Sequence, residues 1–322
     1  MIKGLIKNIA KIGASLYDMK YLINKSSHRV LLPFYHAVSD ENPIHIKNLY
    51  EPRGVEEFKN DLDFLLKHYQ SISLQELIEI NKSAKPIPKN CFHLTFDDGL
   101  REFYTVVAPI LKEKGVHATV FLNSDFIDNK DLFFRFKASI LFEELQNDEL
   151  LRLTYSEVDV LDGLANEVDT DFNKFLKNEQ PYLTTEQITE LIGDGFTFGA
   201  HSKNHPLYKE LSLEEQIFQT KESLDFIKST FNLNYSVFSF PFTDDGVSAA
   251  FFNEIDGVTD LTFGCAGIKE DTAKNHLQRI AMEGHSGNPL KGIVKSGKSI
   301  IKEEYTYCLL KQKLGKNRIE RG

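Results

Sequence analysis

The sequence has few of the residues that mark disulfide-rich or nucleotide-binding proteins. Its 322 residues include no tryptophan and three widely spaced cysteines, Cys91, Cys265 and Cys308, with no Cys-x-x-Cys pair. A disulfide framework or a cysteine-based zinc site is therefore not expected, and a reducing, cytoplasmic location fits best. No Gly-x-Gly-x-x-Gly or Walker sequence follows a predicted strand, which argues against the usual nucleotide-binding folds.

Long apolar runs are also missing, so no transmembrane helix is expected. Lysines interrupt the apolar residues of segment 1–28, which argues against a signal peptide. The segment instead predicts an amphipathic helix, with lysines at every fourth position and an apolar stripe that comprises Ile2, Leu5, Ile6, Ile9, Ile12 and Leu16. Two interpretations stay open: a helix packed on its own domain, or a basic helix lying on an anionic membrane surface.

Charge is distributed unevenly along the chain. The formal net charge is −9, yet residues 1–30 carry six Lys or Arg against one Asp, and residues 291–322 carry nine against three Glu. The central part is therefore strongly acidic, which argues against nucleic-acid binding by the main body. The two basic ends predict peripheral association with a membrane.

Apolar segments alternate with helical patterns from residue 29 onward. The predicted strands span 29–38, 91–96, 117–124, 196–200, 235–240 and 260–266. The predicted helices between and after them span 54–69, 102–114, 184–193, 213–229 and 247–255. Strands that are apolar on both faces and separated by helices predict a parallel α/β sheet, either doubly wound or closed into a (β/α) barrel.

Three regions follow from this pattern. Residues 1–28 form the N-terminal helix, residues 29–285 the α/β domain, and residues 286–322 a basic helix and tail. Residues 128–182 interrupt the α/β rhythm with polar, helix-prone sequence and are interpreted as a mostly helical insertion.

Two adjacent carboxylates, Asp97 and Asp98, stand where the apolar strand in "HLTFDDGL" ends. Neighbouring like charges repel, so one of them resists ionisation unless a cation lies close by. A plain Asp-Gly turn is the alternative explanation.

A second polar cluster follows strand 196–200, in "FGAHSKNHP". His201 and His205 are four residues apart, and Pro206 disfavours a long helix there, so a single turn brings the imidazoles together. The carboxyl ends of parallel strands meet at one edge. One aspartate and two histidines there would make a three-ligand metal site, and the other aspartate would act as a base.

These residues resemble a known family. "TFDDG" and "HSKNHP" are similar to the first two motifs of polysaccharide deacetylases, the NodB-homology carbohydrate esterases, and "FYHAV" (34–38) and "FSFPF" (238–242) resemble further landmarks. The resemblance covers roughly residues 30–285, without the insertion. It implies a distorted (β/α)7 barrel and metal-dependent hydrolysis of an N-acetyl group on a sugar.

The resemblance also implies roles for individual residues. Asp98, His201 and His205 would bind the metal, Asp97 would be the general base, and Ser202 would orient the histidine loop by hydrogen bonding. Zn2+ is preferred, with Co2+, Fe2+ and Mn2+ as alternatives.

The third motif departs from the family pattern Arg-x-Pro-Tyr-Gly, which here reads Ser239, Phe240, Pro241, Phe242 and Thr243. The backbone N–H of Phe242, next to Pro241, would still meet the oxyanion. Arg279 is the predicted replacement for the missing arginine, which would hold Asp97 ionised.

The resemblance implies a late histidine as general acid; His285 is the nearest positional candidate and His36 the alternative, and Asp97 could instead return its own proton to the leaving amine. Glu283, Asp244 and Asp245 are further candidates for the pocket lining, although the two aspartates also suit a turn.

The expected partner is an N-acetylated carbohydrate, and a lipid-linked glycan precursor or a nucleotide sugar would suit the basic ends. Three alternatives stay open: a catalytically impaired carbohydrate-binding member of the fold, an O-acetyl esterase, and a deformylase. The sequence makes no prediction of oligomeric state.

Overall fold

The fold is built around one eight-stranded sheet in which every pair of neighbouring strands is parallel. The computed structural model describes residues 2–26, 28, 30–83, 90–283 and 295–322. Around the sheet the strand order is β11-β9-β8-β7-β6-β5-β2-β12. In chain order the strands are β2 (Pro33–Tyr35), β5 (Leu94–Phe96), β6 (Ala118–Leu122), β7 (Thr197–Ala200), β8 (Val237–Ser239), β9 (Leu261–Gly264), β11 (His276–Gln278) and β12 (Ile280–Ala281).

The sheet is nearly closed into a barrel, because its two edge strands follow each other in the chain. Only Arg279 separates β11 from β12; its N–H donates to Gly264 O on one side, and the next N–H, of Ile280, donates to Leu32 O on the other. Every residue of β6 is buried. Its alternate side chains enter two different apolar clusters, Val120 in one and Phe121 in another, as expected for a strand covered on both faces. The predicted α/β barrel class is thus confirmed.

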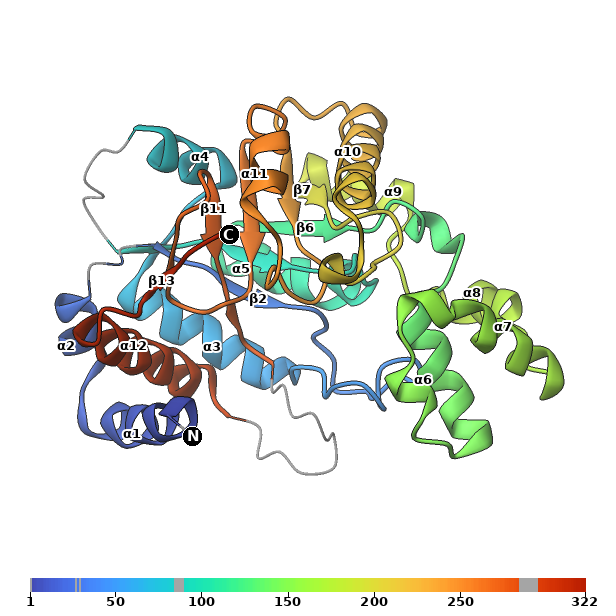
Figure 1. Cartoon of the computed structure of the whole chain (residues 1–322), viewed down its shortest axis with the longest axis horizontal. Helices are drawn as coiled ribbons and strands as arrows, with labels where there is room; N and C mark the ends of the chain where they lie inside the picture. Colours follow the sequence, from blue (N-terminus) through green and yellow to red (C-terminus); the bar gives the residue numbers. More distant parts are fainter. Residues whose placement is uncertain (1, 27, 29, 84–89, 284–294) are drawn as a thin grey trace.

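Helices surround the barrel (Figure 1). They are α3 (Val55–His68), α4 (Leu74–Ser83), α5 (Ala108–Lys114), α9 (Thr185–Gly193), α10 (Leu213–Thr230) and α11 (Ala249–Ile255). The predicted helix 102–114 begins as a π-helical turn, Phe103–Val107. Pro109 explains this irregularity, because it has no N–H to donate to the preceding turn.

Two predicted strands are each divided in the structure. Segment 29–38 gives β1 (Val30–Leu31) and β2, and segment 91–96 gives β4 (Cys91–Phe92) and β5. β1 and β4 pair with each other in a separate three-stranded sheet with β3 (Gln70–Ser71), whereas β2 and β5 pair in the barrel. Each of the two apolar segments therefore contributes one strand to the three-stranded sheet and one strand to the barrel.

Residues 128–182 are mostly helical and contain α6 (Phe134–Leu145), α7 (Val158–Glu167) and α8 (Phe172–Glu179). These helices lie to one side of the barrel and have an apolar cluster of their own (Figure 1). The two ends of the segment are joined where the N–H of Tyr182 donates to Asn129 Oδ1 at 2.9 Å and Asn129 Nδ2 donates to Tyr182 O at 3.2 Å.

The first and last helices pack together on the opposite side of the molecule (Figure 1). They are α1 (Ile2–Leu16) and α12 (Gly297–Lys313), with α2 (Met19–Lys25) beside them; β13 (Arg318–Ile319) then pairs with β10 (Glu270–Asp271). Within the described ranges, none of the helices combines the length and apolarity needed to cross a bilayer.

A buried ion pair fastens α3 to this region. Arg53 Nε donates to Asp61 Oδ2, and Arg53 Nη2 to Asp61 Oδ1, each at 2.9 Å. The N–H of Gly297, at the start of α12, donates to the same carboxylate at 2.9 Å. Asp61 thus connects three segments that are distant in sequence.

We expect Asp61→Ala to lower the free energy of unfolding by about 3–5 kcal/mol, because it leaves the Arg53 charge buried without its partner. Urea denaturation followed by circular dichroism measures this change. Asp63→Ala is the matched control, since Asp63 lies on the same helix with its side chain 63% exposed and is expected to change stability by less than about 1 kcal/mol. Equal losses in the two variants would contradict the assignment.

Candidate active site

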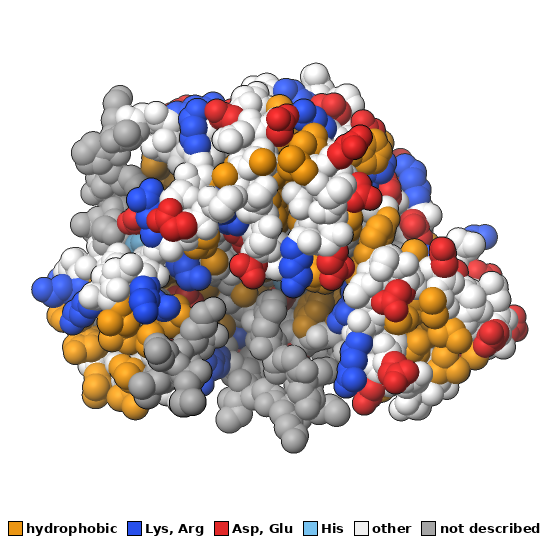
Figure 2. All heavy atoms as spheres, in the orientation of Figure 1, with side chains coloured by type: hydrophobic (Ala, Val, Ile, Leu, Met, Phe, Trp, Pro, Cys, Tyr) orange, Lys and Arg blue, Asp and Glu red, His pale blue; other side chains and the backbone are white. Residues whose placement is uncertain are grey.

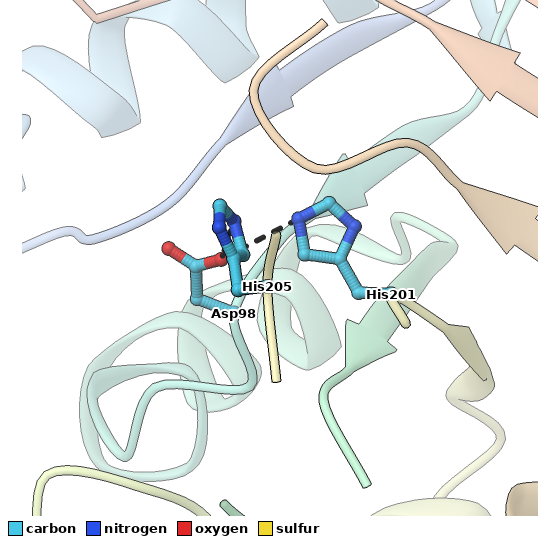
Figure 3. Close-up of side chains that lie close together, drawn as sticks. All are labelled: Asp98, His201 and His205. Atoms are coloured by element: carbon cyan, nitrogen blue, oxygen red, sulfur yellow. Dashed lines mark ion pairs between the residues drawn. The ribbon is translucent and has the colours of Figure 1, made fainter. Parts of the chain in front are cut away.

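Three predicted metal ligands converge at the carboxyl ends of β5 and β7. Asp98 Oδ1 lies 3.5 Å from His201 Nε2 and 3.2 Å from His205 Nε2 (Figure 3). One ligand atom from each residue falls within a 4.8 Å span, and all three side chains are buried. The two interpretations of Asp97-Asp98, a turn and a metal ligand, are compatible. Asp98 and Gly99 form a turn with φ of 70° and 62°, and the Asp98 carboxylate still belongs to the cluster.

The histidine loop owes its shape to two left-handed residues. Ser202 has φ of 67° and His205 has φ of 63°, so the chain turns back without forming a helix. Ser202 Oγ accepts the N–H of His205 at 3.1 Å, and Asn123 Nδ2 donates to the backbone carbonyl of His201. These contacts place both imidazoles over Asp98.

The donor set fits a divalent cation. Asp98 Oδ1 is buried and accepts no hydrogen bond from the described residues. His201 Nδ1 lies 2.8 Å from Ser239 O, so this nitrogen carries the proton and Nε2 keeps its lone pair toward Asp98. Burial lowers the pKa of His201 to about 4, which favours the neutral form that metals bind. Two imidazoles and one carboxylate are a ligand set that suits zinc.

Asp97 lies beside this cluster and is paired with Arg279. Arg279 Nη1 donates to Asp97 Oδ1 at 2.8 Å and Nη2 to Asp97 Oδ2 at 2.7 Å, a bidentate pair in which both side chains are buried. Burial opposes ionisation of the carboxyl group, but the guanidinium outweighs it and holds the pKa of Asp97 below its usual value. Asp97 is therefore ionised at neutral pH.

Ser239 occupies the position where the resemblance noted in the sequence would place an arginine. Its hydroxyl accepts a hydrogen bond from Arg279 Nη2 at 2.7 Å, and Thr95 Oγ1 accepts one from Nη1 at 2.9 Å. Arg279 thus crosses the barrel interior from the seam between β11 and β12, and the small side chain of Ser239 hydrogen-bonds it there.

His36 and Glu283 form a second charged pair near the site. His36 Nδ1 lies 2.5 Å from Glu283 Oε2, and Glu283 Oε1 accepts the backbone N–H groups of His36 and Ala37. Burial disfavours the imidazolium, but the Glu283 carboxylate outweighs this and raises the pKa of His36 to about 9. The other predicted acid, His285, lies outside the described residues.

Phe242 follows Pro241 in the loop after β8 and adopts φ of 57°. Its ring centroid is 4.5 Å from that of His205, and its side chain is 44% exposed. Among the described residues, no group accepts the backbone N–H of Phe242.

The two aspartates predicted for the pocket lining in this loop have contacts of their own. Asp245 is exposed, and its N–H donates to Thr243 Oγ1. Asp244 is buried next to Asp271 and His276, a group with the spacing of a metal site. Arg321 supplies the positive charge there, since its guanidinium contacts Asp244 and donates to Asp271 Oδ2 at 2.7 Å. Asp244 is therefore part of an ion-pair network that fixes the loop.

Two residues near the site were not predicted from the sequence. The ring of Phe133, at the start of the insertion's helix α6, lies 4.3 Å from that of His205, and the Phe133 N–H donates to Tyr182 Oη. The ring centroids of Tyr50 and His36 are 5.4 Å apart, and the buried Tyr50 hydroxyl has no hydrogen-bond partner in the described ranges. Neither belongs to a motif; the aromatic run "LFFRF" was the only available signal for Phe133.

Comparisons with known proteins agree with this geometry. The family model for polysaccharide deacetylase matches residues 84–254. A 44-residue stretch is 46% identical to the poly-beta-1,6-N-acetyl-D-glucosamine N-deacetylase of Escherichia coli strain K12; it covers 14% of this chain and 6% of that protein. The chain therefore matches only a small part of this curated relative.

Solved structures of low sequence identity share the fold. IcaB from Ammonifex degensii superposes with a TM-score of 0.56 at 13% identity, over 88% of this chain and 98% of that one. The Streptococcus pyogenes deacetylase PplD, solved in complex with acetate, gives 0.55 at 18% identity, over 82% and 96%.

The ligand cluster makes a direct prediction about metal binding. Changes outside the ligand shell alone weaken metal affinity by about 10–100-fold, so His205→Ala is expected to weaken Zn2+ binding by more than about 100-fold. Calorimetric titration of the metal-free protein measures this. His276→Gln, in the Asp244–Asp271 group, is the control and is expected to keep the wild-type affinity. Equal loss in both variants, with both folded by circular dichroism, would contradict the site.

Proposed function

Because the chain belongs to the polysaccharide deacetylase family, we propose that it is a metal-dependent deacetylase acting on an N-acetylated sugar of a polysaccharide or glycan precursor. The reaction would release acetate and leave a free amine. The observation that carries the proposal is an ionised carboxylate, Asp97, held by Arg279 directly beside the cluster of Asp98, His201 and His205.

The cluster residues would hold a divalent cation, with zinc preferred, which when bound polarises the acetamide carbonyl and lowers the pKa of a water molecule. Asp97 accepts the proton of the attacking water, because Arg279 keeps this carboxylate charged without donating a proton to it. The water oxygen bonds to the carbonyl carbon as its proton moves to Asp97.

The N–H of Phe242 is the proposed donor to the oxyanion. It is free of other acceptors among the described residues and belongs to a loop fixed by Asp244 and Arg321. A donor held in place before the reaction stabilises developing charge more than a mobile one does.

His36 is the proposed general acid. With a pKa of about 9 it is protonated at neutral pH and can give its proton to the nitrogen as the carbon–nitrogen bond breaks. The proton on Asp97 then returns to His36 and restores both groups.

The alternative of a catalytically impaired binding protein drew its support from the missing motif arginine and from the uncertain late histidine, whose candidate His285 lies outside the described residues. Arg279 removes the first of these two supports, since it makes a bidentate contact with Asp97. The curated relative acts, by its name, on poly-β-1,6-N-acetyl-D-glucosamine, so oligomers of this sugar are the first substrate to test. An O-acetyl ester or N-formyl group would fit the same chemistry.

We expect Asp97→Asn to reduce kcat by about 10²–10⁴-fold, because the amide accepts no proton while the ligand cluster stays intact. Acetate release from β-1,6-linked N-acetylglucosamine oligomers measures kcat, and calorimetry measures bound Zn2+. Asp245→Asn, on an exposed side chain nearby, is the control. An Asp97→Asn variant with unimpaired turnover would refute the role of base; release from neither enzyme, with Zn2+ bound, would favour the binding protein.

The assignment of His36 as general acid predicts how kcat changes at alkaline pH. The pKa of His36 is raised by Glu283, so its proton is present at neutral pH and kcat is expected to fall as pH rises through about 9. Glu283→Gln removes the carboxylate and should move this decline to lower pH. A decline at the same pH in both enzymes would assign it to another group.

A further inference from the structure

Packing within the fold buries only part of the apolar face of helix α1. The helix packs mainly on α12, where Ile6, Ala10 and Ala14 are buried. The two helices approach closely at Gly13, because a Cβ atom there would lie 2.6 Å from Thr306 Cγ2. The first interpretation of this helix, packing on its own domain, thus describes only one side of it.

The other side of the apolar face points to solvent. Ile9, Ile12 and Leu16 follow a helical spacing and are 45%, 64% and 74% exposed. Tyr17 and Tyr21 continue the surface onto α2, with their rings stacked at 4.7 Å. Figure 2 shows hydrophobic side chains gathered over this corner of the molecule. We name these five residues the α1–α2 patch.

The segment that carries the patch has an almost entirely positive set of charges. Residues 1–30 hold six Lys or Arg and a single acid, Asp18. The Asp18 carboxylate is already used, since it accepts the N–H of Tyr21 as the N-cap of α2. Lys11, Lys20 and Lys25 are exposed, and Lys25 Nζ lies 5.9 Å from the Tyr21 ring centroid.

We propose that the α1–α2 patch lies on an anionic lipid bilayer. Exposed aliphatic side chains, tyrosines and lysines close together in one segment are the combination that favours the interface between headgroups and acyl chains. The lysines complement anionic headgroups, whereas a second copy of the chain would bring like charges together. The helix would lie in the plane of the interface, because α12 covers its other side.

Vesicle co-sedimentation without substrate tests this binding. The wild-type protein is expected to pellet with vesicles of phosphatidylcholine and phosphatidylglycerol, less with phosphatidylcholine alone, and less again at high salt. Ile12→Ser with Leu16→Ser should lower the partition coefficient by about tenfold or more, because both apolar side chains leave the interface.

The matched control is Val160→Ser with Phe218→Ser, which removes two side chains, 49% and 54% exposed, from α7 and α10. It should bind vesicles like the wild type. Equal loss in both double variants, or wild-type protein that stays in the supernatant, would overturn the proposal. A wild-type dimer that the Ile12/Leu16 variant converts to monomer, without vesicle binding, would assign the patch to self-association instead.

The outcome is independent of catalysis. Deacetylation of soluble oligomers by the Ile12/Leu16 variant is expected to equal that of the wild type, since neither residue is near the site. Failure of membrane binding therefore leaves the proposed activity standing, and failure of the activity leaves the binding measurement interpretable.

Discussion

The bidentate contact between Arg279 and Asp97 connects the closure of the barrel to its chemistry. The backbone of Arg279 occupies the seam between β11 and β12, and its side chain reaches Asp97 at the end of β5. Both side chains are buried, and a buried charge that loses its partner costs several kcal/mol. Closure of the barrel in this register is therefore stabilised when Asp97 is ionised and paired with Arg279, so that one contact serves both the fold and the arrangement of the site.

Backbone strain is concentrated around the same site. Asp98, Ser202, His205 and Phe242 are all in the left-handed region, which costs a non-glycine residue of order 1–3 kcal/mol. The other non-glycine residues with positive φ in the described chain are all Asn, Asp or Gln, and Asn and Asp, like His, adopt this conformation more readily than Phe. The hydrogen bond from the His205 N–H to Ser202 Oγ and the packing of Phe242 on His205 offset the strain. The loops are thereby held with their ligand atoms converging.

The barrel and the residues that converge at its strand ends could be predicted from local sequence patterns, because each pattern lies within one segment of the chain. Apolar strands separated by helices specify parallel strands, and polar residues at the strand ends then meet at one edge. Other features depend on which strands close the sheet. The contact between Arg279 and Asp97 spans 182 residues, and its prediction came from the arginine that this chain lacks in the family's third motif, not from a local pattern. The contact of Phe133 with His205 comes from an insertion without a family motif and was not predicted. The division of segments 29–38 and 91–96 arises from pairing in two sheets, which hydrophobicity alone does not distinguish.

The third motif of this chain has Ser239 where the family pattern has an arginine, and the cation that contacts Asp97 comes from Arg279 instead. The electrostatic requirement is a cation against Asp97, and the interior of a small barrel can be reached from several strands. Ser239 on β8 is too short to supply it, yet its hydroxyl accepts a hydrogen bond from the guanidinium that does. An arginine at position 239 would compete with Arg279 for the same carboxylate and bury a second positive charge. The serine and the seam arginine are therefore complementary, since the short side chain leaves room for the guanidinium and accepts a hydrogen bond from it.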